Sequence, residues 1–274
     1  MDFQQKEQYT IADLERIIAL LRAPDGCPWD REQTHQSVRA NFIEETYEAI
    51  EAIDTNNVEL LKEELGDVLM QVLFHAQMEA ELGTFTFADV VDGVAKKLIV
   101  RHPHVFGDVH VKDSAQVLSN WDEIKKKTKS QTTQTEVLES VSTALPSLMR
   151  SYKVQKKAAK VGVDIQNAEQ ALDDLIMCAH RLKKSLSQQE TIGLSDEQVG
   201  DLLFASVHVA RKCGVEPEFS LTKACNRFII YFAVVEKYTQ KKEICWSDLT
   251  HEELNAIWRQ VATEKFSQIE NEIY

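Results

Sequence analysis

Two pairs of acidic residues are the first feature of this sequence with evident chemistry. They lie in the stretch FIEETYEAIEAIDTNNVELLKEELGDVL, residues 42–69, where Glu45 precedes Glu48 by three positions and Glu64 precedes Asp67 by three. Side chains three apart on a helix are rotated by about 300° and therefore share a face. If the two segments are helices that pack together, four carboxylates converge in one groove.

Carboxylates crowded into a partly desolvated groove repel one another unless protons or cations neutralise them. Hard divalent cations prefer oxygen ligands, and Mg²⁺ typically takes a few carboxylates, keeps some waters and recruits phosphates. The spacing therefore predicts a Mg²⁺ site. Two alternatives stand beside it: a solvated acidic helix face, and a di-iron bundle, which needs Glu-x-x-His pairs that His75 does not complete.

The elements that must position these acids are helices. Nine glycines, five prolines and many apolar i, i+3, i+4 patterns indicate an all-α chain. The expected helices are 11–22, 36–53, 58–82, 87–101, 114–128, 146–160, 167–187, 196–213, 217–239 and 251–270. Thr10 and Thr86 are placed to cap two of them. The polar segment DTNN at 54–57 predicts a short turn and hence an antiparallel hairpin.

The first half of the chain recurs after a polar segment. GDVLMQVLFHA from Gly66 is echoed by GDLLFASVHVA from Gly200, and residues 125–141 lack apolar periodicity. We therefore expect a domain at 1–128, a linker at 129–145 and a second, similar domain at 146–274.

Composition excludes some classes of partner. The formal net charge of −13 argues against a polymeric nucleic acid, which needs clustered Lys and Arg. The N-terminus lacks the basic start and apolar run of a signal peptide, and no window approaches the ~18 apolar residues of a membrane span. A cytoplasmic protein without a membrane partner is the expectation.

The acids also carry a family resemblance. The pattern Glu44-Glu45-x-x-Glu48 followed by Glu64-x-x-Asp67 resembles the signature of the MazG nucleoside triphosphate pyrophosphohydrolases, part of the all-α NTP pyrophosphatase superfamily. The segments GCPWD at 26–30, RHPHVFGD at 101–108 and NWDEIKK at 120–126 are similar to the same family. The likeness covers essentially the whole chain, including its tandem arrangement.

The resemblance implies Mg²⁺-dependent hydrolysis of nucleoside triphosphates to the monophosphate and pyrophosphate, with broad base tolerance, in nucleotide-pool cleaning. It implies metal ligation by Glu45, Glu48, Glu64 and Asp67, with Glu44 as an outer residue or a base for the attacking water. The candidate substrate contacts are Lys97, Arg101 and Lys125 for phosphates, and Trp29 and Trp121 for the base. Each could instead be a surface charge or core filling. A homodimer or higher homo-oligomer is implied as well.

The second copy has lost part of the pattern. DDLIM at 173–177 and QVGD at 198–201 keep Asp174 and Asp201, but Met177 and Gln198 stand where carboxylates are needed. Arg227 and Tyr231 replace the Lys97 and Arg101 positions approximately. We therefore expect a degenerate second domain. Alternative functions are a narrower dUTP, dCTP or phosphoribosyl-ATP pyrophosphohydrolase, and a non-catalytic helical scaffold.

Overall fold

The fold is all-α, as expected from the sequence. The computed structural model describes residues 3–128, 131–187 and 192–261, and within these ranges every regular element is a helix. The chain divides into two compact units, Met1–Thr128 and Lys129–Tyr274. None of the described helices combines the length and the apolar character needed to cross a bilayer.

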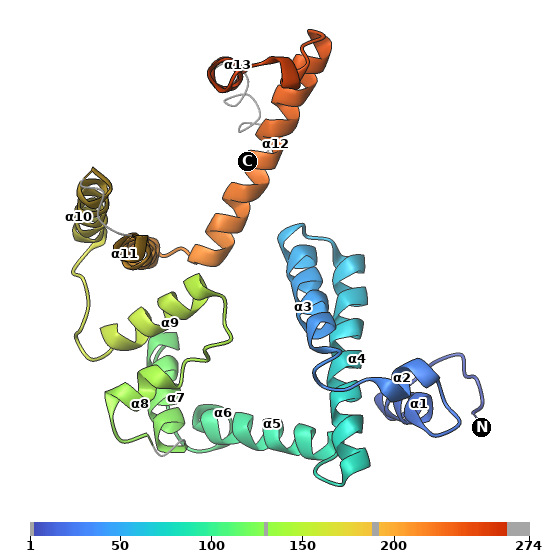
Figure 1. Cartoon of the computed structure of the whole chain (residues 1–274). Helices are drawn as coiled ribbons and strands as arrows, with labels where there is room; N and C mark the ends of the chain where they lie inside the picture. Colours follow the sequence, from blue (N-terminus) through green and yellow to red (C-terminus); the bar gives the residue numbers. More distant parts are fainter. Residues whose placement is uncertain (1–2, 129–130, 188–191, 262–274) are drawn as a thin grey trace. The chain divides into compact units, whose positions relative to one another are not determined.

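The first unit contains the acidic hairpin (Figure 1). Its helices are α1 (Ile11–Arg22), α2 (Pro28–Glu32), α3 (Arg39–Asp54), α4 (Val58–Leu82), α5 (Phe87–Arg101), α6 (Pro103–Phe106) and α7 (Ser114–Thr128). The expected bounds of α1, α4, α5 and α7 are confirmed. Helices α2 and α6 were not expected, because five and four residues are too few to show an apolar period.

Side-chain caps fix several of these helix ends. Thr10 and Thr86 each form a capping box with the aspartate three residues later, at the starts of α1 and α5. Asn57 caps α4 by accepting a hydrogen bond from the Leu60 amide. Helix α4 ends at Gly83, whose φ of 72° is left-handed and favours glycine. The cap residues explain why these boundaries could be read from the sequence.

Helix α3 begins at Arg39, three residues later than expected. The preceding segment is held as a turn by reciprocal hydrogen bonds between Thr34 and Ser37, in which each backbone amide donates to the other side chain. His35, inside this turn, hydrogen-bonds to α4. These contacts compete with helical backbone bonds and delay the start of α3.

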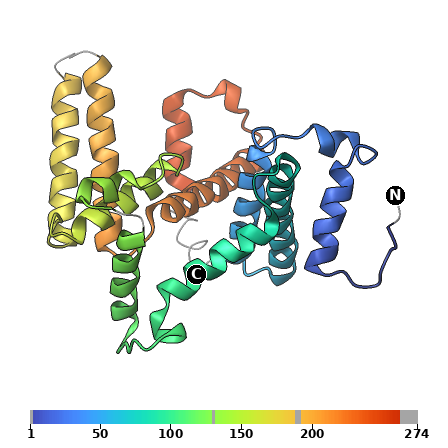
Figure 2. The same cartoon turned by 90° about the horizontal axis from the view of Figure 1, so that it is seen from below.

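Helices α3 and α4 form the expected antiparallel hairpin and lie side by side in both views (Figures 1 and 2). Ala49 and Ala52 of α3 are buried, at 7% and 1% exposure. They share a helix face with Glu45 and Glu48, since the four positions follow the i, i+3, i+4, i+7 pattern. The predicted acids of α3 therefore lie on the face that α3 turns toward α4.

The apolar core of the first unit lies at the other end of α4. Leu73, Phe74 and Met78 of α4 pack with Ile18 of α1 and Val38, which precedes α3. The half of α4 that carries Glu64 contributes none of these residues. Burial of the apolar cluster thus holds the hairpin in place while its first half remains available for polar chemistry.

A turn in the GCPWD segment depends on a glycine. The Gly26 amide donates to the Ala23 carbonyl and the Cys27 amide to the Leu21 carbonyl, both at 2.8 Å. A Cβ atom on Gly26 would overlap the backbone carbonyls of Leu20 and Leu21. These carbonyls belong to α1 and cannot move without distorting the helix.

We expect Gly26→Ala to destabilise the protein by about 1–3 kcal/mol, the usual cost of overpacking. Gly93→Ala is the matched control, because Gly93 is mid-helix and a Cβ there meets no atom within 4 Å. That variant should gain roughly 0.5–1 kcal/mol from helix propensity. Urea unfolding measures both, and equal effects of the two substitutions would contradict the close approach at Gly26.

Two histidines tie the turn before α3 to α4. The Nδ1 atoms of His35 and His75 are 2.6 Å apart, and His35 Nε2 lies 2.7 Å from Glu79 Oε1. The two rings are stacked, and Phe42 packs against His75. Burial, and then the neighbouring His35, lower the pKa of His75 below its usual 6.5. Two protonated rings cannot share this contact.

Acidification should therefore weaken the fold through His75. A histidine whose pKa is lowered by folding is protonated more readily in the unfolded chain, so stability falls as pH drops below about 6.5. Glu79, whose pKa is lowered by Thr84 and His35, loses its contribution only below its usual 4.5. We expect His75→Phe to flatten the stability profile between pH 6.5 and 5, measured by urea unfolding, whereas His110→Phe, at an exposed site, should leave the slope unchanged.

The second unit repeats the hairpin. Its elements are α8 (Gln134–Glu139), α9 (Ser147–Ala159), α10 (Ala168–Ser187), α11 (Ile192–Lys212), α12 (Pro217–Lys241), a 3₁₀ turn (Trp246–Asp248) and α13 (His251–Val261). Helices α10 and α11 lie side by side (Figures 1 and 2). The expectation of helix beyond residue 261 falls outside the described residues. The segment 129–145, expected as a linker, contains α8, which begins with a Thr133–Glu136 capping box.

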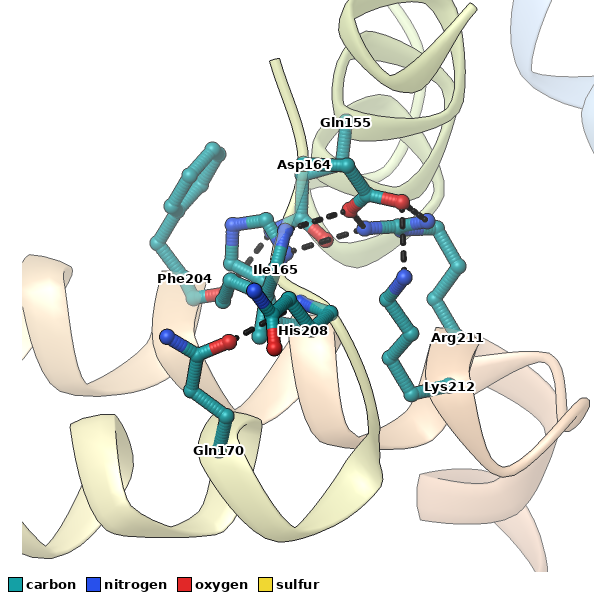
Figure 3. A network of polar contacts seen from close by, with 9 residues as sticks. Gln155, Asp164, Ile165, Gln170, Phe204, His208, Arg211 and Lys212 are labelled. Carbon is teal, nitrogen blue, oxygen red and sulfur yellow. Dashed lines mark hydrogen bonds and ion pairs between the residues drawn. The ribbon is translucent and has the colours of Figure 1, made fainter. Parts of the chain in front are cut away.

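Charged contacts hold the segment before α10 against α11 (Figure 3). Asp164 accepts hydrogen bonds from Arg211 and from Lys212, the latter at 2.7 Å. The hydrogen bond from Arg211 lowers the pKa of Asp164, burial raises it, and Lys212 lowers it further. The net effect holds the pKa of Asp164 far below its usual range. Gln155 of α9 donates to the Phe204 carbonyl at 2.9 Å. This network is structural and contains no group of acids.

Candidate functional site

Three of the four predicted metal ligands meet in the first hairpin. Glu45 and Glu48 of α3 and Glu64 of α4 each offer a carboxylate oxygen, and these oxygens all lie within 4.8 Å of one another. No other group of three or more His, Cys, Asp or Glu side chains is gathered this closely within the described ranges. The convergence expected from the spacing is thus present for this trio, which we call the acid group.

Glu64 is the least exposed member of the acid group. Its exposed fraction is 6%, and its Oε2 atom is buried without a hydrogen-bond partner. A buried carboxylate without a donor or a cation is unfavourable. The hairpin therefore keeps an unsatisfied anionic oxygen in place, which fits a ligand supplied from outside the chain.

The acids raise one another's pKa. Burial is the main cause of the raised pKa of Glu45, followed by the charges of Asp67, Glu48 and Glu44. Burial is also the main cause of the raised pKa of Glu64, followed by the neighbouring Glu48. Asp67 is outside the acid group, yet its charge raises the pKa of both Glu45 and Glu64. The fourth predicted ligand is therefore an electrostatic neighbour of these two.

The donor set suits a hard divalent cation. All members of the acid group offer carboxylate oxygen, the ligand type preferred by Mg²⁺, Ca²⁺ and Mn²⁺, and the group includes no imidazole or thiolate. A cation would satisfy Glu64 Oε2 and remove the repulsion at once. Glu44, the predicted outer residue, is exposed beside Glu45.

The predicted substrate contacts lie on other helices of the first unit. Trp29 of α2 is 62% exposed, Lys97 of α5 is exposed, and Lys125 of α7 is half-buried. The Arg101 guanidinium lies over the Trp121 ring, 5.4 Å from its centroid. No hydrogen bond, ion pair or ring contact found among the described residues joins Arg101 or Trp121 to the acid group.

Gln71 is a polar residue of the hairpin that the sequence interpretation missed. It lies four residues after Asp67 on the same face of α4, is 6% exposed, and opposes the rise in the pKa of Glu45. Glutamine carries no charge and is common on helices, so its type alone gives no signal. Its spacing from Asp67 and its replacement by Ala205 in the second copy are the signals that could have found it.

The second hairpin lacks the acid group. Asp201 and Met177 are exposed, and Asp174 is half-buried. Gln198 donates to Ser185 across the hairpin at 2.9 Å. A neutral amide thus stands where the first hairpin has a carboxylate, and its Oε1 atom is likewise buried without a partner.

An apolar hollow in the first unit is not part of this site. It has a volume of about 300 Å³ and is lined by Phe3, Ile17, Leu20, Leu21, Gly26 and Cys27. It borders none of the acids and offers no charged group to a phosphate. We assign no catalytic role to it.

The all-α hairpin and its acid group define a class of protein, the helical nucleotide pyrophosphohydrolases. The family model of the MazG nucleotide pyrophosphohydrolase domain matches residues 33–106, a range that includes all four predicted metal ligands. A Thermotoga maritima protein named nucleoside triphosphate pyrophosphohydrolase/pyrophosphatase MazG is 38% identical over 90% of this chain and 93% of its own length. The chain belongs to the MazG family.

Other relatives agree over similar lengths. The Escherichia coli nucleoside triphosphate pyrophosphohydrolase is 35% identical, covering 91% of this chain and 95% of the relative. The Bacillus subtilis protein named uncharacterized protein YabN is 41% identical over 89% of this chain. The match covers only 50% of the length of YabN.

Proposed function

We propose that this protein hydrolyses nucleoside triphosphates to nucleoside monophosphates and pyrophosphate, with Mg²⁺ and with broad tolerance of the base. Membership of the MazG family supports the reaction class. The observation that carries the proposal is the acid group, in which Glu64 keeps a buried oxygen without a partner. Removal of nucleotides from the cellular pool is the corresponding role.

Glu45, Glu48 and Glu64 would hold the cation, with Asp67 beside them. When bound, Mg²⁺ polarises phosphoryl oxygens, lowers the pKa of a coordinated water and offsets the charge of the pyrophosphate product. The protein's contribution is to keep the carboxylates gathered before substrate arrives. Because burial and mutual repulsion are already present in the fold, the site is preorganised for positive charge.

Glu44 is our candidate for the base. It is exposed next to Glu45, and in this role it would take a proton from the attacking water. The reaction consumes one water and breaks the anhydride linkage between the α and β phosphates. No covalent intermediate with the protein is needed.

The remaining predicted residues would bind the substrate. Lys97, Arg101 and Lys125 would contact phosphates, and Trp29 and Trp121 would border the base. Trp29 offers a flat and exposed ring, and stacking on such a surface tolerates any base because it does not read the base edge. This is the physical argument for broad specificity.

The proposal is tested by incubating the full chain with a panel of ribo- and deoxyribonucleoside triphosphates, with and without Mg²⁺. We expect monophosphate and pyrophosphate in equimolar amounts, formed only with the cation, from several bases. Orthophosphate as the main product would contradict the reaction. Activity on a single nucleotide would contradict the broad specificity, and no turnover at all would favour a scaffold.

Self-association is part of the proposal. Val90, Val94 and Leu98 form a stripe on α5 and are 38%, 41% and 43% exposed. Ile43 and Leu65, on the hairpin helices, are more than half exposed, at 52% and 55%. Covering such surfaces with a second copy would remove apolar area from water. Light scattering after size exclusion should give a mass of at least twice 31.2 kDa.

A further inference from the structure

Arg101 is held by an aromatic ring rather than by a carboxylate. Its guanidinium lies over the Trp121 ring, 5.4 Å from the ring centroid, and no carboxylate within the described ranges forms an ion pair with it. Arg22 also lies over a ring, that of Phe74, but it is paired with Glu81 at 2.8 Å as well. A carboxylate neutralises the cation that it holds. An aromatic ring restrains the cation and leaves its charge available to an anion.

The Trp121 ring is itself fixed against the end of α5. The His102 and Trp121 rings lie 4.8 Å apart, centroid to centroid, at an interplanar angle of 72°. His102 Nδ1 donates to the Leu98 carbonyl at 2.6 Å, so the backbone of α5 sets the direction of the imidazole. Trp121 belongs to α7, and its two contacts join that helix to the C-terminal end of α5. The indole ring is therefore a fixed support for the Arg101 side chain.

In the second unit, the corresponding tryptophan has an aromatic partner. Trp258 echoes Trp121 in the repeat, and Tyr231 stands at about the position of Arg101. The Trp258 ring lies 5.2 Å from the Phe228 ring, centroid to centroid. Packing of this tryptophan therefore does not require an arginine at the Arg101 position. The arginine is present in the unit that has the acid group.

We propose that Trp121 is a positioning residue for Arg101, which holds the guanidinium ready for the triphosphate of the substrate, whatever Trp121 contributes to the base. The inference rests on the phosphate contact of Arg101 in the proposed function. A long side chain loses rotamer freedom when it binds an anion, and a restraint already present in the fold lowers that cost. Loss of the ring should therefore weaken the binding of phosphates, with any base or with none.

Inorganic tripolyphosphate is the probe, because it carries phosphates like those of the substrate and no base. Its inhibition constant is measured from the formation of nucleoside monophosphate by the full chain, with Mg²⁺ in excess of total phosphate. We expect Trp121→Leu to raise this constant roughly 2- to 30-fold, the usual strength of a cation–π contact expressed as an affinity. Trp121→Phe keeps an aromatic face and should recover most of the loss.

Trp29→Leu is the matched control, since Trp29 is 62% exposed on α2 and is assigned to the base alone. It should leave the inhibition constant of tripolyphosphate unchanged. If Trp121 only borders the base or only fills space, folded Trp121→Leu will also leave the constant unchanged, and the positioning role is overturned. Circular dichroism establishes folding, and Trp121→Met, with a more adaptable side chain, tests the same loss if Trp121→Leu does not fold.

A double-variant cycle separates an effect through Arg101 from a direct contact of Trp121 with phosphate. In the Arg101→Gln background, Trp121→Leu should change the inhibition constant by less than about twofold, because no guanidinium is left to hold. A further loss as large as that seen with Arg101 present would overturn the role assigned to Trp121.

Failure of this inference is distinguishable from failure of the proposed function. If Arg101→Gln raises the inhibition constant and folded Trp121→Leu does not, the positioning role fails and the phosphate contact of Arg101 stands. If tripolyphosphate does not inhibit the wild type, or if Arg101→Gln leaves the constant unchanged, that phosphate contact is overturned together with the inference. A wild type that forms no nucleoside monophosphate would overturn the proposed function itself, and the inference with it.

Discussion

Glu64→Gln is expected to abolish pyrophosphate release and at the same time to make the metal-free protein more stable. The loss should be at least about 100-fold, as for removal of a single electrostatic contact in an active site. The gain in stability follows because glutamine carries no charge into a buried position among other acids. Its amide can also donate to Glu48, a contact that needs a proton in the wild type.

The stability gain should depend on pH in a defined direction. The pKa of Glu64 is raised by folding, so the folded state binds its proton more tightly than the unfolded chain does. Wild-type stability therefore falls as pH rises above the unfolded pKa of about 4.5. The variant should match the wild type near pH 4 and exceed it at pH 7.

Urea unfolding at both pH values, with and without Mg²⁺, measures these effects. Magnesium should stabilise the wild type and leave Glu64→Gln unchanged, because only the wild type binds it. Glu51→Gln is the control, as Glu51 is an exposed acid of the same hairpin. A Glu64→Gln variant that is less stable than the wild type at pH 7 would contradict the inference that the Glu64 carboxylate is destabilised by burial and by the neighbouring acids.

Asp67→Asn should be about two to three orders of magnitude less active than Asp201→Asn, the expected cost of losing an active-site electrostatic contact. The two aspartates occupy equivalent positions in the two hairpins, after Gly66 and Gly200. Asp67 acts on the pKa of Glu45 and Glu64. Asp201 is exposed and has no acid group beside it within the described residues.

Steady-state release of pyrophosphate from one nucleoside triphosphate measures both variants. The double variant Asp174→Asn/Asp201→Asn removes the acids at the positions equivalent to Glu45 and Asp67 and should retain wild-type kcat/KM. If Asp201→Asn were the inactive variant instead, the active hairpin would be the second one and the assignment of the first unit would be wrong. Circular dichroism of both variants confirms that the comparison is between folded proteins.

The sequence predicted the long helices better than the short ones. Helix α4 has a capping Asn57 and a terminal Gly83 at its two ends, so its bounds were readable from residue types alone. Helix α8 spans six residues, too few for a period, and its Thr133–Glu136 capping box stood in a segment interpreted as a linker. The late start of α3 depends on the local Thr34–Ser37 turn and on contacts of His35 with α4, and the latter are contained in no local pattern.

For the candidate site, the sequence predicted which acids share a helix face but not how each is buried. That Glu64 alone is buried depends on the packing of α3 on α4. The partner of Arg101 was also unreadable: the structure puts its guanidinium over Trp121, where the sequence suggested phosphate and base contacts separately. Such pairings join residues far apart in the chain and are set by tertiary structure.

The two buried alanines of α3 set the distance between α3 and α4. Ala49 and Ala52 present single methyl groups to α4, and small side chains allow helix backbones to approach closely. Because helices are stiff over a turn, the distance between the helix backbones at the alanines also sets the distance between the carboxylates one turn away. In the proposed cation site, these alanines would therefore influence which size of ion fits, although neither touches it, and we expect a bulkier side chain at position 52 to shift the preference from Mg²⁺ toward the larger Ca²⁺.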